Sequence, residues 1–279
     1  MQRLIIGLLL FISIGCSAQD LRQIVILHNN DTHSRIEPMP ENDAAAGLGG
    51  VLRQAGYINT VRSENETVLL FHSGDFVQGT PYFNLFGGRA EIACMDMMRY
   101  DAVTLGNHEF DNGLDSLARM LRNAYFPVVT TNLDFSGTVL EGRTQKYVIL
   151  FRGGLKIGVI GLLVDPEGLI TANNYRGMQY LDPLQTANET AALLKERDHC
   201  DLVICLSHLG YTAEKAGQFT DVDLAKNSRN IDIILGGHSH TLLQSAARYK
   251  NLDGQEVVID QVGDKGIYMG RLDVTMAKQ

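Results

Sequence analysis

Tryptophan is absent from this chain of 279 residues, and cysteine and proline are scarce, with four and six copies. Four cysteines without a CxxC pair exclude the dense disulfide framework that stabilises small secreted folds. Cys200 and Cys205 bracket a strand-like run that would hold them roughly 16 Å apart, beyond the reach of a disulfide. We therefore expect both side chains to be buried thiols.

Basic residues are also in short supply, with 24 lysines and arginines against 32 aspartates and glutamates and a net charge of −8. This acidic balance excludes electrostatic binding of a nucleic-acid polymer. An anionic substrate would need a local source of positive potential, and this requirement points to bound metal ions. With 45% hydrophobic and 20% charged residues, the composition is that of an ordinary globular protein.

The sequence lacks an apolar run of membrane-spanning length. Residues 4–14 are apolar or small and suit a secretory signal peptide. Small residues before Gln19 fit ordinary signal cleavage, whereas the four residues that end at Cys16 resemble a lipobox. We expect residues 1–18 to be a signal peptide and residues 19–279 to be an exported domain. It would be periplasmic or held at a membrane by lipid on Cys16, and the alternative is a freely secreted protein.

Buried strands and amphipathic helices alternate along the chain, with no linker, composition shift or internal repeat. This order predicts a single α/β domain. The predicted helices span residues 51–62, 90–99, 115–123 and 183–197. The predicted strands span residues 23–27, 67–71, 101–105, 127–131, 201–206, 231–235, 256–262 and 266–275, with a hairpin over 147–151 and 156–162 that starts a second sheet segment.

Five of these strands end in side chains that can bind metal ions. The carboxyl ends of strands are where α/β folds place their chemistry. Five of the eight histidines of the chain occupy such positions, so the pattern is not that of ordinary polar turns. The residues are Asp31 and His33 after the first strand, Asp75 after the second, Asn107 and His108 after the third, His208 after the strand at 201–206, and His238 and His240 after the strand at 231–235.

This mixture of carboxylate oxygen and imidazole nitrogen suits Zn²⁺, Mn²⁺ or Fe, whereas a calcium site would use oxygen throughout. Two divalent ions fit the number of ligands if Asp75, alone on its strand, bridges them. The ions would supply four positive charges against two carboxylates, so the centre would attract phosphate in spite of the acidic surface. The alternative is a series of polar turns without metal.

The motifs LHNNDTHSR, SGDFVQGTP, LGNHEFDNG, SHLGY and GGHSH resemble those of the calcineurin-like metallophosphoesterases, and more narrowly the 5′-nucleotidase branch, over residues 24–275. The resemblance implies a four-layer αββα sandwich of two mixed sheets flanked by helices. It also implies a role for each motif residue. Asp31, His33, Asp75 and His240 would hold one ion, Asp75, Asn107, His208 and His238 would hold the other, and His108 with Asp111 would form the catalytic pair.

His240 departs from relatives that have glutamine in its place, a change that could tune metal preference. His108 has a role that can be argued physically, because an imidazolium held by Asp111 can stabilise or protonate the leaving oxygen of a phosphoester. The alternative for Asp111 is an N-cap of the following helix. Glu109 has an open role, and Asn30 is expected to be a turn residue.

The resemblance predicts hydrolysis of nucleotide phosphoesters outside the cytoplasm. Members of the 5′-nucleotidase branch commonly carry a C-terminal domain that binds the base, so we expect a separate specificity domain or partner protein. The alternative is a chain that acts alone on small phosphoesters. Further alternatives are 2′,3′-cyclic nucleotides, nucleotide sugars or envelope phosphoesters as substrates, and a non-catalytic lipoprotein that binds a metal or a partner.

Overall fold

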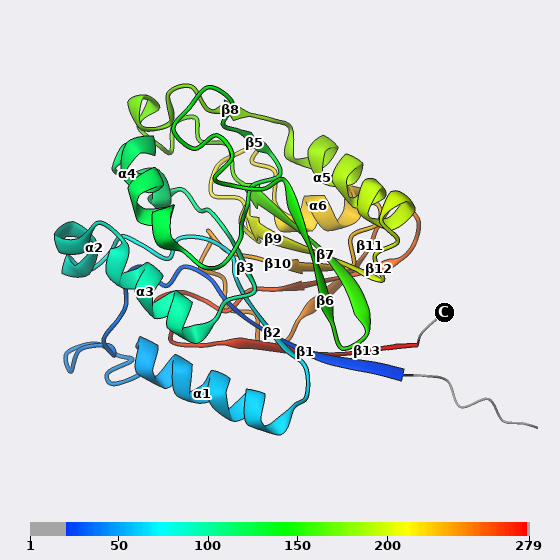
Figure 1. Ribbon diagram of the computed structural model, residues 1–279, viewed down its shortest axis with the longest axis horizontal. Coiled ribbons are helices and arrows are strands. Elements are labelled where there is room, and N and C mark those ends of the chain that lie inside the picture. Colours follow the sequence, from blue (N-terminus) through cyan, green and yellow to red (C-terminus); the bar gives the residue numbers. More distant parts are fainter. Residues whose placement is uncertain (1–20, 278–279) are drawn as a thin grey trace, which may run out of the picture.

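The computed structural model describes residues 21–277, which form two sheets face to face between layers of helices (Figure 1). The predicted signal peptide, residues 1–18 with Cys16, lies outside the described residues. Within residues 21–277, the helices are too short or too polar to cross a membrane.

The first sheet has the strand order β13-β1-β2-β3-β4. Strands β1 to β4 run parallel, and β13 pairs antiparallel with β1, so the sheet is mixed. Successive side chains of β1 face opposite sides: Ile24 and Ile26 pack in one core, and Val25 and Leu27 in another. The bounds are β1 Leu21–Asn29, β2 Val68–His72, β3 Ala102–Thr104, β4 Val128–Val129 and β13 Gly270–Ala277.

The second sheet has the strand order β11-β12-β10-β9-β7-β6. Its four inner strands are parallel, and both edge strands are antiparallel. The bounds are β6 Tyr147–Arg152, β7 Leu155–Leu163, β9 Leu202–His208, β10 Ile233–Leu235, β11 Ala247–Lys250 and β12 Glu256–Asp260. A separate antiparallel pair joins β5 Leu133–Asp134 to β8 Gln179–Tyr180.

Three hydrophobic cores separate the four layers. One core lies between the first sheet and helices α1 to α4, the second lies between the two sheets, and the third lies between the second sheet and helices α5 and α6. The predicted four-layer sandwich of two mixed sheets is therefore confirmed. The bounds are α1 Val51–Glu64, α2 Pro81–Phe86, α3 Arg89–Met98, α4 Gly113–Met120, α5 Pro183–Ala192 and α6 Asp221–Asn227.

The sequence prediction misses several short elements. Helices α2 and α6 and strand β11 were not predicted, although the capping box of Thr220 and Asp223 marks the start of α6. The predicted helix at 183–197 ends as an α-helix at Ala192 and continues as a π-turn, Leu193–Arg197. The two C-terminal strands join different sheets, since β12 pairs with β10 and β13 with β1. Cys200 and Cys205 are buried and free, as predicted.

Gly161 on β7 lies where the two sheets touch. A Cβ atom at this position would lie 2.1 Å from the Val129 carbonyl oxygen and 2.6 Å from Thr104 Oγ1. We expect Gly161→Ala to lower the free energy of unfolding by about 1–3 kcal/mol or more, because the backbone of the opposite sheet must shift. Urea denaturation measures this change.

Gly56→Ala is the matched control. Gly56 is exposed on α1, and a Cβ atom there would meet nothing within 4 Å. The control substitution should raise the free energy of unfolding by about 0.5–1 kcal/mol, since alanine favours the helix. Similar effects of the two substitutions would contradict the packing described for Gly161.

Candidate dinuclear metal centre

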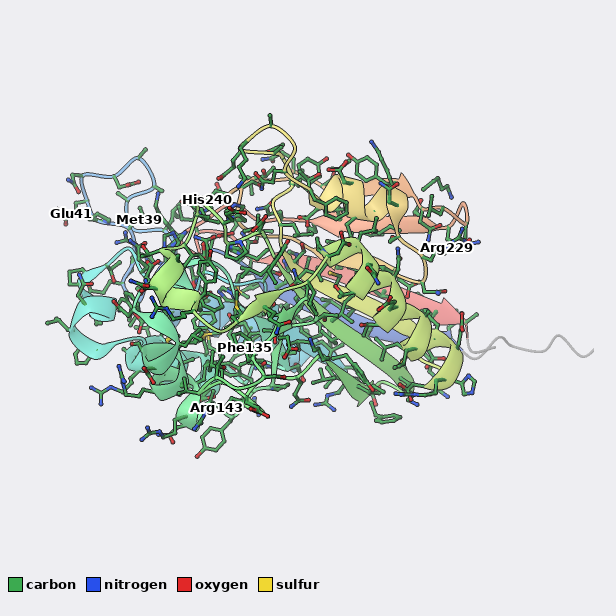
Figure 2. All side chains as sticks on the ribbon, turned by 90° about the horizontal axis from the view of Figure 1, so that it is seen from above. Met39, Glu41, Phe135, Arg143, Arg229 and His240 are labelled. Carbon is green, nitrogen blue, oxygen red and sulfur yellow. The ribbon has the colours of Figure 1, made fainter. Side chains whose placement is uncertain are left out.

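The seven predicted ligands lie along one seam between the sheets. The loops that follow β1, β2 and β3 meet the loops that follow β9 and β10, and the backbone N–H of His238 donates to Asp31 Oδ2 at 3.0 Å across this seam. His240 lies at the same edge of the molecule as the loop that carries Met39 and Glu41 (Figure 2). Among the seven, only His240 is exposed, and the other six are buried: Asp31, His33, Asp75, Asn107, His208 and His238.

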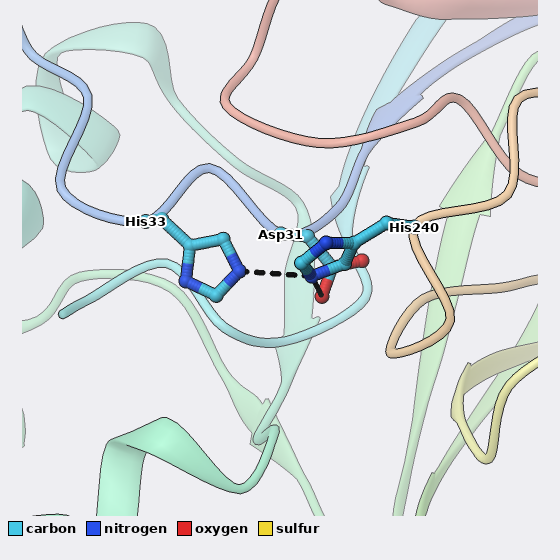
Figure 3. Close-up of side chains that lie close together, drawn as sticks. All are labelled: Asp31, His33 and His240. Carbon is cyan, nitrogen blue, oxygen red and sulfur yellow. Dashed lines mark hydrogen bonds and ion pairs between the residues drawn. The ribbon is translucent and has the colours of Figure 1, made fainter. Parts of the chain in front are cut away.

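Asp31, His33 and His240 form the first group of converging ligand atoms (Figure 3). The Nε2 atoms of His33 and His240 are 3.0 Å apart, and His240 Nε2 lies 3.5 Å from Asp31 Oδ1. All three ligand atoms lie within 4.8 Å of one another. This group contains three of the four ligands predicted for one ion, and the donor set suits a first-row divalent metal.

Asp31, Asp75 and His208 form the second group. His208 Nδ1 donates to the Ser73 carbonyl at 2.7 Å, which directs Nε2 toward the carboxylates, 3.1 Å from Asp75 Oδ2. Burial lowers the pKa of His208, but Asp75 and Asp31 outweigh it and raise this pKa to about 10. The space around His208 Nε2, beside the Asp75 and Asp31 carboxylates, therefore favours a positive charge.

Asn107 and His238 also fit a cation beside this group. The buried Asn107 Oδ1 has no hydrogen-bond partner among the described residues, and a buried amide oxygen left unpaired is costly unless a ligand satisfies it. His238 belongs to none of the converging ligand groups among the described residues, although its ring centroid lies 5.2 Å from that of His208. Burial lowers the pKa of His238 to about 3, so the ring is neutral and can act as a ligand. Its Nε2 atom lies 3.6 Å from Glu214 Oε2.

Five of the seven candidate ligands have a left-handed backbone. Residues other than glycine rarely adopt positive φ, and such strain collects at functional sites. The strain belongs to the sharp loops that turn these side chains into the seam. The residues and their φ angles are Asp31 (50°), His33 (47°), Asp75 (54°), His238 (72°) and His240 (50°).

His108 and Asp111 form a hydrogen-bonded pair at the open side of the centre. His108 Nδ1 lies 2.8 Å from Asp111 Oδ2, and the His108 backbone N–H donates to Asp75 Oδ1 at 2.9 Å. The hydrogen bond to Asp111 raises the pKa of His108 to about 9. The N-cap of α4 is Asn112, so the alternative role of Asp111 as that N-cap is wrong.

Two neighbouring residues have roles that the sequence did not reveal. The buried Glu109 carboxylate accepts hydrogen bonds from backbone N–H groups of two loops, among them the Asp75 N–H at 2.9 Å and the Gly106 N–H at 2.5 Å. Asn30, expected in a turn, donates from Nδ2 to Asp31 Oδ2 at 2.6 Å and orients that carboxylate. In the sequence, these roles could have been suspected only because Glu109 lies in the motif LGNHEFDNG and Asn30 lies in the motif LHNNDTHSR. Gly237 is required sterically, because a Cβ there would lie 2.8 Å from the Ser73 carbonyl oxygen.

The other histidines lie outside the candidate ligand set. His28 is buried 3.0 Å from Asp260, and His72 Nε2 lies 3.1 Å from Thr32 Oγ1. His199 is exposed.

The chain resembles nucleotidases in both sequence and structure. It is 31% identical to the snake venom 5′-nucleotidase of Naja atra over 91% of this chain and 50% of the relative. The crystal structure of a 5′-nucleotidase precursor from Thermus thermophilus superposes with a TM-score of 0.83 and 34% identity, over 90% of this chain and 51% of that one. The NAD nucleotidase of Haemophilus influenzae gives 0.81 and 28%, over 92% and 48%.

The chain therefore spans about half the length of these relatives. A sequence model of the calcineurin-like phosphoesterases matches residues 24–242, which include all seven candidate ligands and the His108–Asp111 pair. The predicted resemblance is confirmed, and the expected class of enzyme, a metal-dependent phosphoric ester hydrolase, is the class of this family. The chain belongs to the calcineurin-like phosphoesterase family.

Proposed function

We propose that this protein is a dinuclear metal-dependent phosphohydrolase that acts on nucleotide phosphoesters in the manner of a 5′-nucleotidase. The observation that carries the proposal is the convergence of two buried carboxylates, Asp31 and Asp75, with imidazoles from both sheets and the unpaired Asn107 Oδ1. The mixed oxygen and nitrogen donors suit Zn²⁺, Mn²⁺ or Fe.

The ligands divide between two ions as the family pattern implies. The first ion would take Asp31, His33, Asp75 and His240, and the second would take Asp75, Asn107, His208 and His238. Asp75 is suited to be shared, because its carboxylate contributes to a group with His33 and His108 and to a group with Asp31 and His208. When bound, the ions supply Lewis acidity toward phosphoryl oxygen and lower the pKa of water.

His108 would act as the acid that donates a proton to the leaving oxygen. The Asp111 carboxylate fixes the ring through Nδ1, which leaves Nε2 free to face the substrate. With its raised pKa, the ring is charged at neutral pH and can stabilise or protonate the leaving oxygen of a phosphoester. The partial exposure of this pair, with 32% of the His108 side chain accessible, lets a substrate reach it.

Two other functions remain as alternatives. The first is a phosphodiesterase or pyrophosphatase that acts on 2′,3′-cyclic nucleotides, nucleotide sugars or envelope phosphoesters, and the similarity to an NAD nucleotidase supports a nucleotide-derived substrate. A non-catalytic metal-binding or partner-binding lipoprotein would not need the hydrogen-bonded His108–Asp111 pair, so this pair argues against that function.

We further propose that the protein is exported, either as a periplasmic protein or as a lipoprotein anchored through Cys16. Mass spectrometry of the mature N-terminus tests this, since an unmodified N-terminus at Met1 would contradict export.

Recognition of the base would come from a separate domain of the C-terminal 5′-nucleotidase type. The chain matches about half of each nucleotidase relative, so the unmatched half of those relatives is the candidate for this role.

The proposed roles of His108 and Asp75 are separable by mutation. We expect His108→Ala to lower kcat by about 10²–10⁴-fold while both ions remain bound, because it removes the acid and leaves the ligands. Asp75→Asn should lose metal as well as turnover, because it weakens both ligand sets. Phosphate release from nucleoside monophosphates and elemental analysis measure the two effects.

His199→Ala is the control for these variants, because His199 is exposed and outside the centre. It should match the wild type in turnover and in metal content. Unchanged turnover in His108→Ala would contradict the proposed acid role. A wild type that binds no divalent ion would contradict the proposed function.

The pH dependence follows from the His108–Asp111 hydrogen bond. Because the pKa of His108 is raised to about 9 in the folded protein, the resulting stabilisation is fully present below the unfolded pKa of about 6.5. It is lost as pH rises through about 9. In metal-free Asp111→Asn, the NMR titration of His108 should move toward about 6.5, and this part of the stability profile should vanish. A His108 pKa that stays near 9 in the variant would contradict the pairing.

Base specificity tests the proposed separate domain. The chain alone should hydrolyse AMP, GMP, CMP and UMP with kcat/KM values within about tenfold of one another. A site without hydrogen bonds to the base cannot reject the wrong one strongly. Discrimination of a hundredfold or more by the isolated chain would show that base recognition is built into it.

A further inference from the structure

Glu109 forms a hydrogen-bonded clamp between two loops of the candidate metal centre. Its carboxylate accepts from the backbone N–H groups of Asp75 and Phe76, both at 2.9 Å, and of Val77 at 3.3 Å. It also accepts from the Gly106 N–H at 2.5 Å. The first three donors belong to the loop after β2, and the fourth belongs to the loop after β3. One carboxylate therefore ties the two loops together.

The two loops are in direct backbone contact where the clamp holds them. A Cβ atom on Gly74 would lie 2.5 Å from the Gly106 backbone nitrogen, and a Cβ on Gly106 would lie 2.2 Å from Asp75 Oδ1. Real Cβ atoms do not approach other atoms so closely, so the loops fit only without side chains at these positions.

Each loop carries one of two candidate ligands of the same ion. Asp75 directly follows Gly74, and Asn107 directly follows Gly106. Asn107 Oδ1 is buried without a partner, so its position is not set by any hydrogen bond of its own among residues 21–277. Instead, the loop must aim it. The clamp joins this loop to the one that carries Asp75, beside the hydrogen bond from the His108 N–H to Asp75 Oδ1.

We propose that Glu109 is a positioning residue that holds Asp75 and Asn107 in the arrangement that binds the second metal ion. The inference rests on the proposed metal centre and goes beyond it, because Glu109 touches neither the ligand atoms of Asn107 nor those of the histidines. Second-layer hydrogen bonds of this kind commonly change metal affinity by about 10–100-fold when they are removed.

A purely structural role would be different in its consequences. A glutamate that only stabilised the fold would affect the unfolding temperature and leave metal stoichiometry unchanged in the molecules that remain folded. A positioning glutamate should affect metal binding in fully folded protein. The amide of glutamine has one acceptor oxygen, and its NH₂ group would face N–H donors, so Glu109→Gln keeps the shape of the side chain and breaks part of the clamp.

The test is titration of the metal-free protein with Mn²⁺, with stoichiometry measured by calorimetry. Wild type should bind two ions. Folded Glu109→Gln, at temperatures below its unfolding transition, should bind the second ion about 10–100-fold more weakly, so that stoichiometry falls toward one at concentrations that saturate wild type. Two ions bound with unchanged affinity would overturn the inference and leave the proposed function intact.

Glu91→Gln is the matched control. Glu91 on α3 is as buried as Glu109, at 4% exposure against 2%, but its two carboxylate oxygens accept no hydrogen bond from the described residues. It makes the same change from carboxyl to amide without opening the clamp, so it should bind two ions with wild-type affinity. A loss of the second ion in Glu91→Gln equal to that in Glu109→Gln would show that removing any buried carboxyl group has this effect, and it would overturn the clamp.

Hydrogen exchange in metal-free wild type tests the clamp without any variant. The N–H groups of Phe76, Val77 and Gly106 lie outside helices and strands, yet they should exchange slowly because they donate to Glu109. Exchange at the rate of unprotected amides would overturn the proposal even if Glu109→Gln failed to fold. A wild type with protected amides that bound no Mn²⁺ would instead refute the metal centre on which the inference rests.

Discussion

The burial of two carboxylates at the junction of two sheets is the constraint on which the rest of this structure depends. Asp31 is 0% exposed and Asp75 is 2% exposed. An ionised carboxylate in such a place is costly unless positive charge or hydrogen-bond donors compensate for it. The ion-pair partners that the described residues offer to these two groups are histidines, His208 and His240 among them. Imidazoles can carry a proton or bind a cation, so positive charge in the seam adds to the hydrogen bonds that Asp31 and Asp75 accept from Asn30, His238 and His108.

Bringing the ligands together in this seam requires a strained backbone in the loops that carry them. Parallel strands from both sheets end beside one another, and short loops must then turn the side chains of Asp31, Asp75 and His238 inward, which places their backbones at positive φ. Each such residue costs on the order of 1–3 kcal/mol, and the packing around it must offset that cost. Three hydrophobic cores, each between two layers, provide the rigid frame. Close backbone contacts at Gly74 and Gly106 are the second consequence, because ligand loops can converge so tightly only where side chains are missing.

Sequence patterns predicted the features that depend on residues close together in the chain, namely the strands and the polar residues that follow them. Apolar runs such as residues 67–71 and 201–206 located the strands, and the polar residues after them located the candidate ligands, because parallel strands place their carboxyl ends at one edge. What depended on tertiary contact was not predictable. Glu109 stands beside His108 in the same motif, but its four donors are backbone N–H groups whose position exists only in the folded chain. The pairing of β13 with β1 was hidden in the same way, since an alternating strand does not name its partner.

The centre is closed on one side and open on the other, and this asymmetry determines how a substrate can approach. The side chain of His208 is fully buried, whereas 42% of the His240 side chain and 32% of the His108 side chain are accessible. Under the proposed function, a phosphate bound at ions in the seam would enter past His240 and His108, and its leaving group would point outward, toward the His108–Asp111 pair. The part of the substrate beyond the leaving oxygen then lies outside the seam. A group that selected the base would then have to reach it from outside the seam, past His240 and His108, whereas the proposed ligands of the phosphate-binding ions lie within the seam.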